Sequence, residues 1–405
     1  MENTFSHLLI LRESWAKKLN FKIFNYTFDE ILYFIGFSLY LGAHFITGTM
    51  FNTGAIPYKI FMASAVIVGF KIILYNPIKK IWTAALCILL MFIFHISASH
   101  SNLPDIFYYY IMILGAFNVD YRKIVKLTII EVAIGLLITF ISAKMGTIIG
   151  LTYDRNNGSY NLRYALGTIY PSDLAARIFY MSTFYVMYRK FRLSIPEYLS
   201  LLLLTVWTYL VTITKLDTIL MMLLIITAVF YSKIVGILEK ITYKAMIYAE
   251  LVAVAAICLL SYFYTDSNPI LRAINNIITG RLYFAREAFN RYNVTLYGQN
   301  VLQNGSGGIH HGSFDYFYID CSYIRLLMMS GLVSFVIVIG LLAYLTYYFV
   351  KNKFYPLLIA LFLVFLSSFI DQHLLEISYN ILLLSLFANC SYFFDNIVPF
   401  NKSAE

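Results

Sequence analysis

The sequence predicts an all-α polytopic membrane protein, and two observations carry that prediction. Hydrophobic residues make up 60% of the 405 residues and charged residues only 13%, a balance that is not typical of a water-soluble domain. The apolar residues also fall into successive runs, each near the length of about 20 residues that a helix needs to cross a bilayer. We therefore expect one integral membrane domain over residues 1–405, without a separate soluble domain or a repeat of fixed period.

About twelve apolar runs are candidates for transmembrane helices, and polar or basic turns separate them. The fourth run is short, and only the tight turn from Thr214 to Asp217 separates the seventh from the eighth. The expected spans are 31–50, 57–75, 81–98, 104–117, 125–149, 173–189, 198–214, 216–232, 245–264, 323–350, 354–370 and 374–394.

The distribution of basic residues predicts the orientation of these spans. If the N-terminus is cytoplasmic, 19 of the 30 Lys and Arg residues fall in inner loops or at inner helix ends. Cytoplasmic loops of membrane proteins carry an excess of Lys and Arg, so we expect both termini in the cytoplasm. The net charge of +9 then reflects topology, and we expect no nucleic-acid partner.

The basic residues on the expected outer side differ in type from those on the inner side. Lysine makes 15 of the inner 19, whereas arginine makes 8 of the outer 11. Topology requires only charge, but the planar guanidinium group binds phosphate and carboxylate oxygens through paired hydrogen bonds. The arginines therefore indicate that the protein binds an anion at its outer face. For any single arginine, snorkelling to the membrane surface or pairing with a nearby acid is an equally good explanation.

Two outer loops hold most of the polar candidates. The first, residues 150–172, contains Arg163 and ends where Ser172 is the expected N-cap of the sixth span. A helix N-terminus offers free N–H groups and a partial positive charge to an anion. Arg177 follows Asp173 by one helical turn, so we expect these two to form an ion pair.

The second outer loop, residues 265–322, is the longest polar interval in the chain. Apolar residues recur at helical spacing near 279–293, which predicts an amphipathic helix on the membrane surface. Arg281 stands at its start and is a candidate ligand contact. Arg291 is instead expected to pair with Glu287 at i,i+4 spacing.

Further polar residues are candidates for substrate binding. Ionisable groups converge in the last outer turn, and such groups beside a membrane span indicate function. No cluster has metal-ligand spacing and the four cysteines are scattered, so we expect no metal and no other cofactor. The substrate-binding candidates are Lys215, Arg325, Ser172, His311, Arg286, Asp371 and His373.

Several motifs occur in the order seen in a known family. They are Arg163-x-x-x-Gly167-x-x-x-Pro171-Ser172, then Thr214-Lys215, Gly280-Arg281, Leu296-Tyr297-Gly298 and Asp320-Cys321-Ser322-Tyr323, with Gly331. In this order they resemble the motifs of Wzy-type polysaccharide polymerases and O-antigen ligases. The resemblance covers the outer motifs from Arg163 to Gly331 and not the first five spans.

The resemblance implies a metal-independent glycosyltransferase of GT-C type in a bacterial plasma membrane. Such an enzyme joins oligosaccharide repeat units linked to undecaprenyl pyrophosphate at the outer face. The implied partners are the lipid-linked donor and acceptor, the bilayer, a chain-length regulator and a flippase. Ser172 stands where Asn is common and Lys215 where Arg is common. Asp320-Cys321 replaces the His-Asn of the ligases, which favours a polymerase over a ligase.

The chemistry of glycosyl transfer assigns roles to three residues. A base must take the proton of the acceptor hydroxyl, and cations must stabilise the departing diphosphate. Asp320 is the expected base, at the position where the resembling ligases carry histidine, and Arg281 and Arg163 are the expected catalytic cations. Asp320 would equally serve as the N-cap of the tenth span.

Two other classes of function fit parts of the sequence. A transporter or flippase of an anionic lipid-linked sugar would place charges at mid-membrane, often within inverted repeats and broken helices. The polar residues here lie mainly at the expected outer surface, which weighs against transport. A receptor or assembly partner would keep its activity after loss of the arginines.

Overall fold

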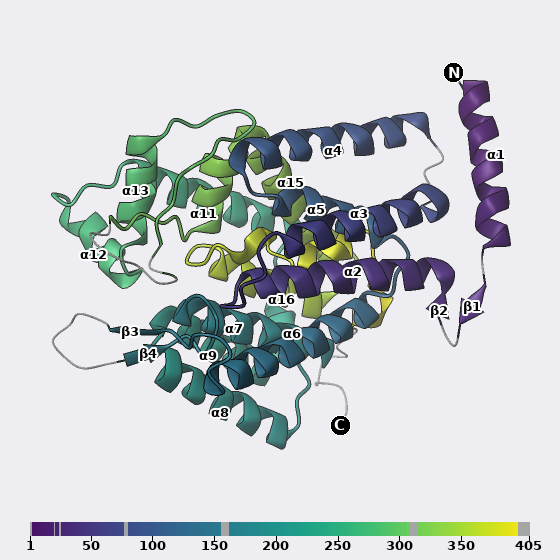
Figure 1. Cartoon of the computed structure of the whole chain (residues 1–405). Helices are drawn as coiled ribbons and strands as arrows, with labels where there is room; N and C mark the ends of the chain where they lie inside the picture. Colours follow the sequence, from purple (N-terminus) through teal and green to yellow (C-terminus); the bar gives the residue numbers. More distant parts are fainter. Residues whose placement is uncertain are drawn as a thin grey trace.

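The computed structural model describes residues 2–19, 21–23, 26–76, 80–154, 162–305, 307 and 315–395, so the candidate His311 lies outside the described residues. Figure 1 shows a bundle in which most helices run side by side, while α1 stands across one end. Two small antiparallel hairpins pair β1 (Lys22–Ile23) with β2 (Tyr26–Thr27) and β3 (Thr152–Asp154) with β4 (Leu162–Tyr164). The helices are α1 (Glu2–Lys18), α2 (Phe28–Thr47), α3 (Ile56–Tyr75), α4 (Ile81–Ser101), α5 (Asp105–Gly115), α6 (Tyr121–Lys144), α7 (Pro171–Tyr188), α8 (Ile195–Thr212), α9 (Lys215–Val229), α10 (Tyr231–Leu238), α11 (Tyr243–Tyr262), α12 (Pro269–Ile277), α13 (Arg281–Arg291), α14 (Ser322–Arg325), α15 (Gly331–Lys351) and α16 (Tyr355–Ser367).

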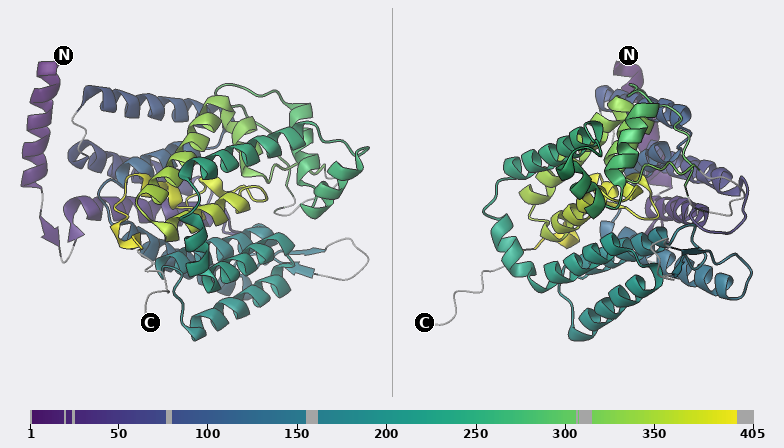
Figure 2. Two further views of the ribbon diagram at one scale, coloured as in Figure 1. Left: turned by 180° about the vertical axis from the view of Figure 1, so that it is seen from behind. Right: turned by 90° about the vertical axis from the view of Figure 1, so that its left-hand side faces the viewer.

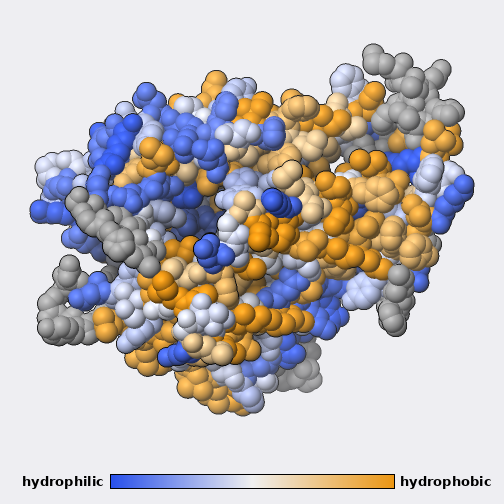
Figure 3. Space-filling model, viewed as in Figure 1, coloured by the Kyte–Doolittle hydropathy of each residue, from blue (hydrophilic) through white to orange (hydrophobic). Residues whose placement is uncertain are grey.

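The structure confirms an all-α, multi-pass membrane protein but offers fewer spans than the twelve expected. Within the described residues, seven helical segments are long and apolar enough to cross a membrane: α2, α3, α4, α6, α8, α11 and the run Ser322–Lys351. α9 and α10 would make an eighth span if taken together, although they meet at 84°. α5 and α16 are apolar but have only 11 and 13 residues. Hydrophobic side chains cover the middle of the bundle (Figure 3).

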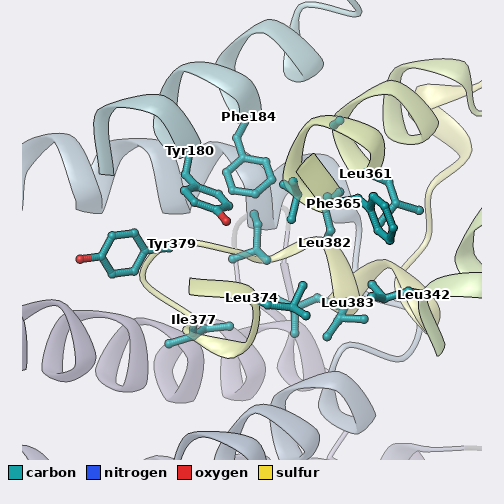
Figure 4. Packing of buried hydrophobic residues seen from close by; sticks show 14 of the residues in the cluster. Tyr180, Phe184, Leu342, Leu361, Phe365, Leu374, Ile377, Tyr379, Leu382 and Leu383 are labelled. Carbon is teal, nitrogen blue, oxygen red and sulfur yellow. The ribbon is translucent and has the colours of Figure 1, made fainter. Parts of the chain in front are cut away.

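The last expected span, residues 374–394, is not a helix of span length, and that prediction was wrong. The segment forms three short 3-10 helices, His373–Leu375, Leu382–Leu386 and Ser391–Phe393, joined by turns. Its apolar side chains are nevertheless buried, and Figure 4 shows Ile377 and Leu382 among side chains of α7, α15 and α16. An apolar run reports burial, and it does not distinguish a spanning helix from another buried conformation.

This irregular segment can be buried because its polar backbone groups find partners. Irregular backbone at membrane depth is tolerated only where protein or water satisfies its N–H and C=O groups. Tyr109 of α5 and Tyr121 of α6 donate their hydroxyl hydrogens to carbonyl groups of the segment. The side chain of Asn380 donates to the Leu374 carbonyl at 2.8 Å and accepts from the Leu382 N–H at 3.0 Å. Side chains thus replace the hydrogen bonds of a regular helix.

The run Ser322–Lys351 is interrupted near its start. α14 leads into a π-helical turn, Leu326–Ser330, and Gly331 then adopts a φ of +87° before α15 continues. The loop at 295–299 packs against this interruption, since its carbonyl groups accept from backbone N–H groups of residues 332 and 333 at 2.9 and 3.0 Å. Single π-helical turns inside helices are frequent at functional sites.

Gly331→Ala is expected to destabilise the protein by about 1 to 3 kcal/mol. A Cβ at this position would lie 2.3 Å from the backbone nitrogen of Gly298, and the φ of +87° disfavours any L side chain. Gly340→Ala in the same helix is the matched control, because its Cβ would meet nothing within 4 Å. Thermal unfolding of the purified proteins in detergent measures both variants. Equal melting temperatures for the two variants would contradict the close approach of the loop at 295–299 to Gly331.

The two ends of the bundle differ in polarity. β3, β4, α12 and α13 lie at one end, which we call the polar end, in both Figure 1 and Figure 2. Figure 3 shows hydrophilic residues concentrated over α12 and α13. At the opposite end, Lys123 at the start of α6 binds Glu30 in the first turn of α2 at 2.9 Å. The long loop that the sequence marks as polar therefore forms one end of the molecule.

Candidate functional site

A polar pocket of about 340 Å³ is built from segments that lie far apart in the sequence. The β3–β4 hairpin, the starts of α7, α9 and α13, and the loops 316–320 and 371–373 supply its wall. Seven of the residues that the sequence singles out line it together: Arg163, Ser172, Lys215, Arg281, Asp320, Asp371 and His373.

Two of the expected substrate-binding residues point elsewhere. Arg286 donates to the backbone carbonyl of Tyr262 and lies over that residue's ring at 5.3 Å. Arg325 donates to the side-chain oxygen of Gln303 at 3.0 Å and lies over the ring of Tyr318 at 5.5 Å. Since Tyr318 lines the pocket, Arg325 supports the wall from behind.

Three helix N-termini meet at the pocket. The first turns of α7, α9 and α13 all contribute lining residues, and each is the positive end of a helix dipole. In α13 the N–H groups of Leu282 and Tyr283 already donate to the side chain of Asn275, so the unpaired N–H groups of the described site come from α7 and α9. The N-cap of α7 is Tyr170, so Ser172 lies inside the first turn and its expected role as the cap was wrong. The arrangement favours a negatively charged ligand.

Two of the cations stand where helix stability does not favour them. Lys215 is the first residue of α9 and Arg281 is the first residue of α13. A positive charge at a helix N-terminus is unfavourable by about 0.3 to 1 kcal/mol at an exposed site. The expected tight turn between α8 and α9 is present, with Ile213 at a φ of +50°, and it directs the start of α9 to the pocket.

Arg281 is held in place by backbone and side-chain partners. Gly280, at a φ of +90°, precedes it and sharply reverses the chain before α13. The guanidinium group donates to the carbonyl of Ile370 and to Thr279. Its nitrogens lie 4.0 Å from an oxygen of Asp320 and 3.9 Å from an oxygen of Asp371. These two separations exceed a direct hydrogen bond, so a small anionic group could compete for the arginine.

Arg163 reaches the pocket from the hairpin. It lies on β4, paired with Tyr153 of β3, and its Nε donates to the carbonyl of Thr212 at the end of α8 at 2.8 Å. The first outer loop, expected only as a polar connection, thus contains a short sheet. This sheet and α8 fix the position of the arginine.

Asp320 does not cap a helix. α14 begins at Ser322 and its N-cap is Cys321, so the expectation that Asp320 is merely the cap was wrong. The Asp320 side chain is 30% exposed and lines the pocket. Burial in the wall raises the pKa of Asp320, and Asp371 adds to the rise, while Arg281 opposes it.

Buried carboxylates that the sequence did not single out also face the site. Asp173 and Asp217 lie in the first turns of α7 and α9, are 8% and 3% exposed, and line the pocket. The Oδ1 atom of Asp217 is buried without a hydrogen-bond partner among the described residues. An acidic residue in the first turn of a helix is common for reasons of helix stability, so the sequence marks Asp173 only as the expected partner of Arg177 and does not mark Asp217.

Two expected ion pairs have different outcomes. Arg291 binds Glu287 at 2.8 Å, which confirms the i,i+4 pair. Arg177, in contrast, forms no ion pair with Asp173 within the described structure. It donates to the backbone carbonyl of Phe45 and lies between 4 and 5 Å from the rings of Phe45 and Tyr379. Its guanidinium group is therefore part of the buried core.

Aromatic side chains form the rest of the wall. Tyr153, Tyr170, Tyr316 and Tyr318 all line the pocket, and the Tyr153 and Tyr170 rings stack at 6.4 Å. Aromatic faces and tyrosine hydroxyls suit sugar rings, which carry both C–H and O–H groups. In the described residues, no three His, Cys, Asp or Glu side chains are arranged to hold a metal ion.

Comparisons with protein-family models, curated proteins and solved structures give no match to this chain.

Proposed function

We propose that the protein is a metal-independent glycosyltransferase of GT-C type, and more narrowly a polymerase of lipid-linked oligosaccharide repeat units. The observation that carries this proposal is the meeting of three helix N-termini with Arg163, Lys215 and Arg281 at one pocket. This set offers N–H groups and fixed positive charge to a diphosphate. A carboxylate, Asp320, and four tyrosines stand beside it.

The proposed reaction uses these groups in distinct roles. The hydroxyl oxygen of the acceptor sugar forms a bond to the anomeric carbon of the donor while the bond from that carbon to the diphosphate breaks. Asp320 takes the hydroxyl proton, and Arg163 and Arg281, with Lys215 in support, stabilise the charge that develops on the departing diphosphate. The proposed donor and acceptor are linked to undecaprenyl pyrophosphate, and the resemblance to Wzy-type polymerases supports that choice.

The proposed setting is a bacterial plasma membrane with the polar end outside and both termini in the cytoplasm. The excess of lysine in the loops of the opposite end supports this orientation. A cysteine at Asn304 is expected to react with a membrane-impermeant reagent in intact cells. Cysteines at Lys123 and Lys240 are expected to react only after permeabilisation. Labelling of Asn304 only after permeabilisation would reverse the orientation.

A defined assay tests the proposed activity. Purified full-length protein is incubated with repeat units linked to undecaprenyl pyrophosphate, and the products are separated by size. A ladder of longer lipid-linked saccharides is expected. A single product on a lipid A acceptor would indicate an O-antigen-type ligase, and absence of any glycosyl transfer would contradict the proposal.

A transporter or flippase of an anionic lipid-linked sugar is the second candidate, and two features of the backbone favour it. The bend of 84° between α9 and α10 and the irregular buried segment after α16 are the kinds of interruption that transporters use. Protein reconstituted into vesicles distinguishes the two functions. Transport predicts movement of the lipid-linked sugar across the bilayer without any change in its length.

A further inference from the structure

The pocket contains more carboxylates than fixed cations. Among its described lining residues, Asp154, Asp173, Asp217, Asp320 and Asp371 stand against Arg163, Lys215 and Arg281. A diphosphate diester carries two negative charges, so like charges would oppose its entry if every carboxyl group were ionised. The helix N-termini offset part of that repulsion, but Asp173 and Asp217 occupy two of the three. A further positive group would complete the site.

His373 has the geometry to supply that charge. Its Nδ1 lies 2.8 Å from an Oε2 of Glu376, so Nδ1 carries a hydrogen and donates it to the carboxylate. The ring stacks on Tyr379 with centroids 3.6 Å apart and planes within 6°, and Tyr180 meets it edge-on. The imidazole is thus held in one orientation, and it lines the pocket. Within the described residues, its second nitrogen, Nε2, has no protein partner.

We propose that His373 acts as a cationic acid toward the departing diphosphate, with Glu376 as its positioning residue. This inference rests on the proposed glycosyl transfer. Protonated Nε2 donates its hydrogen to a diphosphate oxygen as the bond between the anomeric carbon and that group breaks. Asp320 meanwhile takes the acceptor's proton, so one proton is gained and one is given, and exchange with water restores both residues.

The surroundings of His373 stabilise its charged form. Burial is the largest single influence and lowers the pKa of His373, but the carboxylates of Glu376, Asp173 and Asp371 together outweigh it, and the net pKa lies above the ordinary value. The groups that face it from neighbouring elements are Asp173 and Tyr180 of α7, Asp320 before α14, Asp371 and Glu376 of its own loop, and Tyr379 of the irregular segment. The balance of these groups is acidic, which is the environment that keeps an imidazole protonated.

Binding of dimethyl diphosphate tests the inference. Each phosphorus of this diester has a single, strongly acidic hydroxyl, so the molecule keeps two negative charges around neutral pH and any change in its affinity comes from the protein. Wild-type affinity is expected to fall about tenfold per pH unit above the pKa of His373. His373→Gln should bind weakly and keep only the pH dependence that Asp173 contributes, since burial raises the pKa of Asp173 to about 7. Glu376→Gln should show the fall at lower pH, because loss of the carboxylate lowers the pKa of the histidine.

His100→Gln is the matched control, since His100 is exposed on α4 and is not among the residues that line the pocket. If His373→Gln and Glu376→Gln both keep the affinity and pH dependence of His100→Gln, while Arg281→Lys binds more weakly, His373 is not the acid and the diphosphate site stands. If neither the wild-type protein nor any of the variants binds the diester, the proposed function fails along with the inference.

Discussion

Asp320→Asn is expected to slow glycosyl transfer by about 10²- to 10⁴-fold, the usual contribution of a general base. Asparagine matches aspartate in size and keeps its hydrogen-bonding oxygen, but it cannot accept a proton from the acceptor hydroxyl. Since Cys321 and not Asp320 is the N-cap of α14, the change should leave the helix intact. The initial rate with lipid-linked repeat units measures the effect.

The pH profile of the same reaction provides an independent check on Asp320. A carboxylate acts as a base only when it is ionised, so the rate should fall as pH falls through its pKa. Because burial raises that pKa, the loss should begin at a higher pH than for an ordinary aspartate, and Asp320→Asn should lack it. Asp315→Asn, in an exposed position of the same loop, is the control. A wild-type rate in Asp320→Asn would direct attention to Asp371 and His311.

Arg281→Lys is expected to reduce activity tenfold or more, because a charge-assisted hydrogen bond contributes about 1.5 to 3 kcal/mol. Lysine keeps the charge but cannot bind Ile370, Thr279 and a diphosphate oxygen through separate nitrogens of one planar group. Arg163→Lys should also reduce activity. The Nε of Arg163 donates to the Thr212 carbonyl, and a lysine has no second nitrogen with which to bind the diphosphate at the same time.

Arg291→Lys is the matched control for the arginine substitutions. Arg291 ends the same helix, α13, and pairs with Glu287 outside the pocket, so lysine should preserve both its local pair and the activity. Rates at saturating donor, together with the amount of protein in the membrane fraction, separate catalysis from folding. Full activity in both Arg281→Lys and Arg163→Lys would contradict the assignment of these two arginines to binding of the diphosphate.

The sequence predicted the membrane class and much of the pocket because both depend on local composition. Charge type marked Arg163 and Arg281, and helical spacing marked the surface helix that the structure shows as α13 (Arg281–Arg291). Asp173 and Asp217 were missed as site residues because nothing local distinguishes them from helix-stabilising acids. Their proximity to the site depends on how α7, α9 and the chain after α16 pack together.

The conformation of residues 374–394 also could not be predicted from local signals. Its apolar composition matches a spanning helix, and the groups that hold it irregular are distant in sequence. Tyr109 and Tyr121, which bind its carbonyl groups, lie more than 250 residues earlier. Hydropathy reports that such a segment is buried, but only the tertiary partners decide whether its backbone must be helical.

The same segment sets the order in which the pocket can be assembled. Asp371 lies just before it and His373 opens its first 3-10 helix. The residues that hold the segment in place, from α5, α6 and α7, are synthesised long before it. The helices can enter the membrane one after another during synthesis, but the wall formed by loop 371–373 is completed only when the end of the chain folds back among them. A chain that stops before residue 371 therefore holds the three helix N-termini without the residues that close the site, and the pocket forms only after this segment has packed.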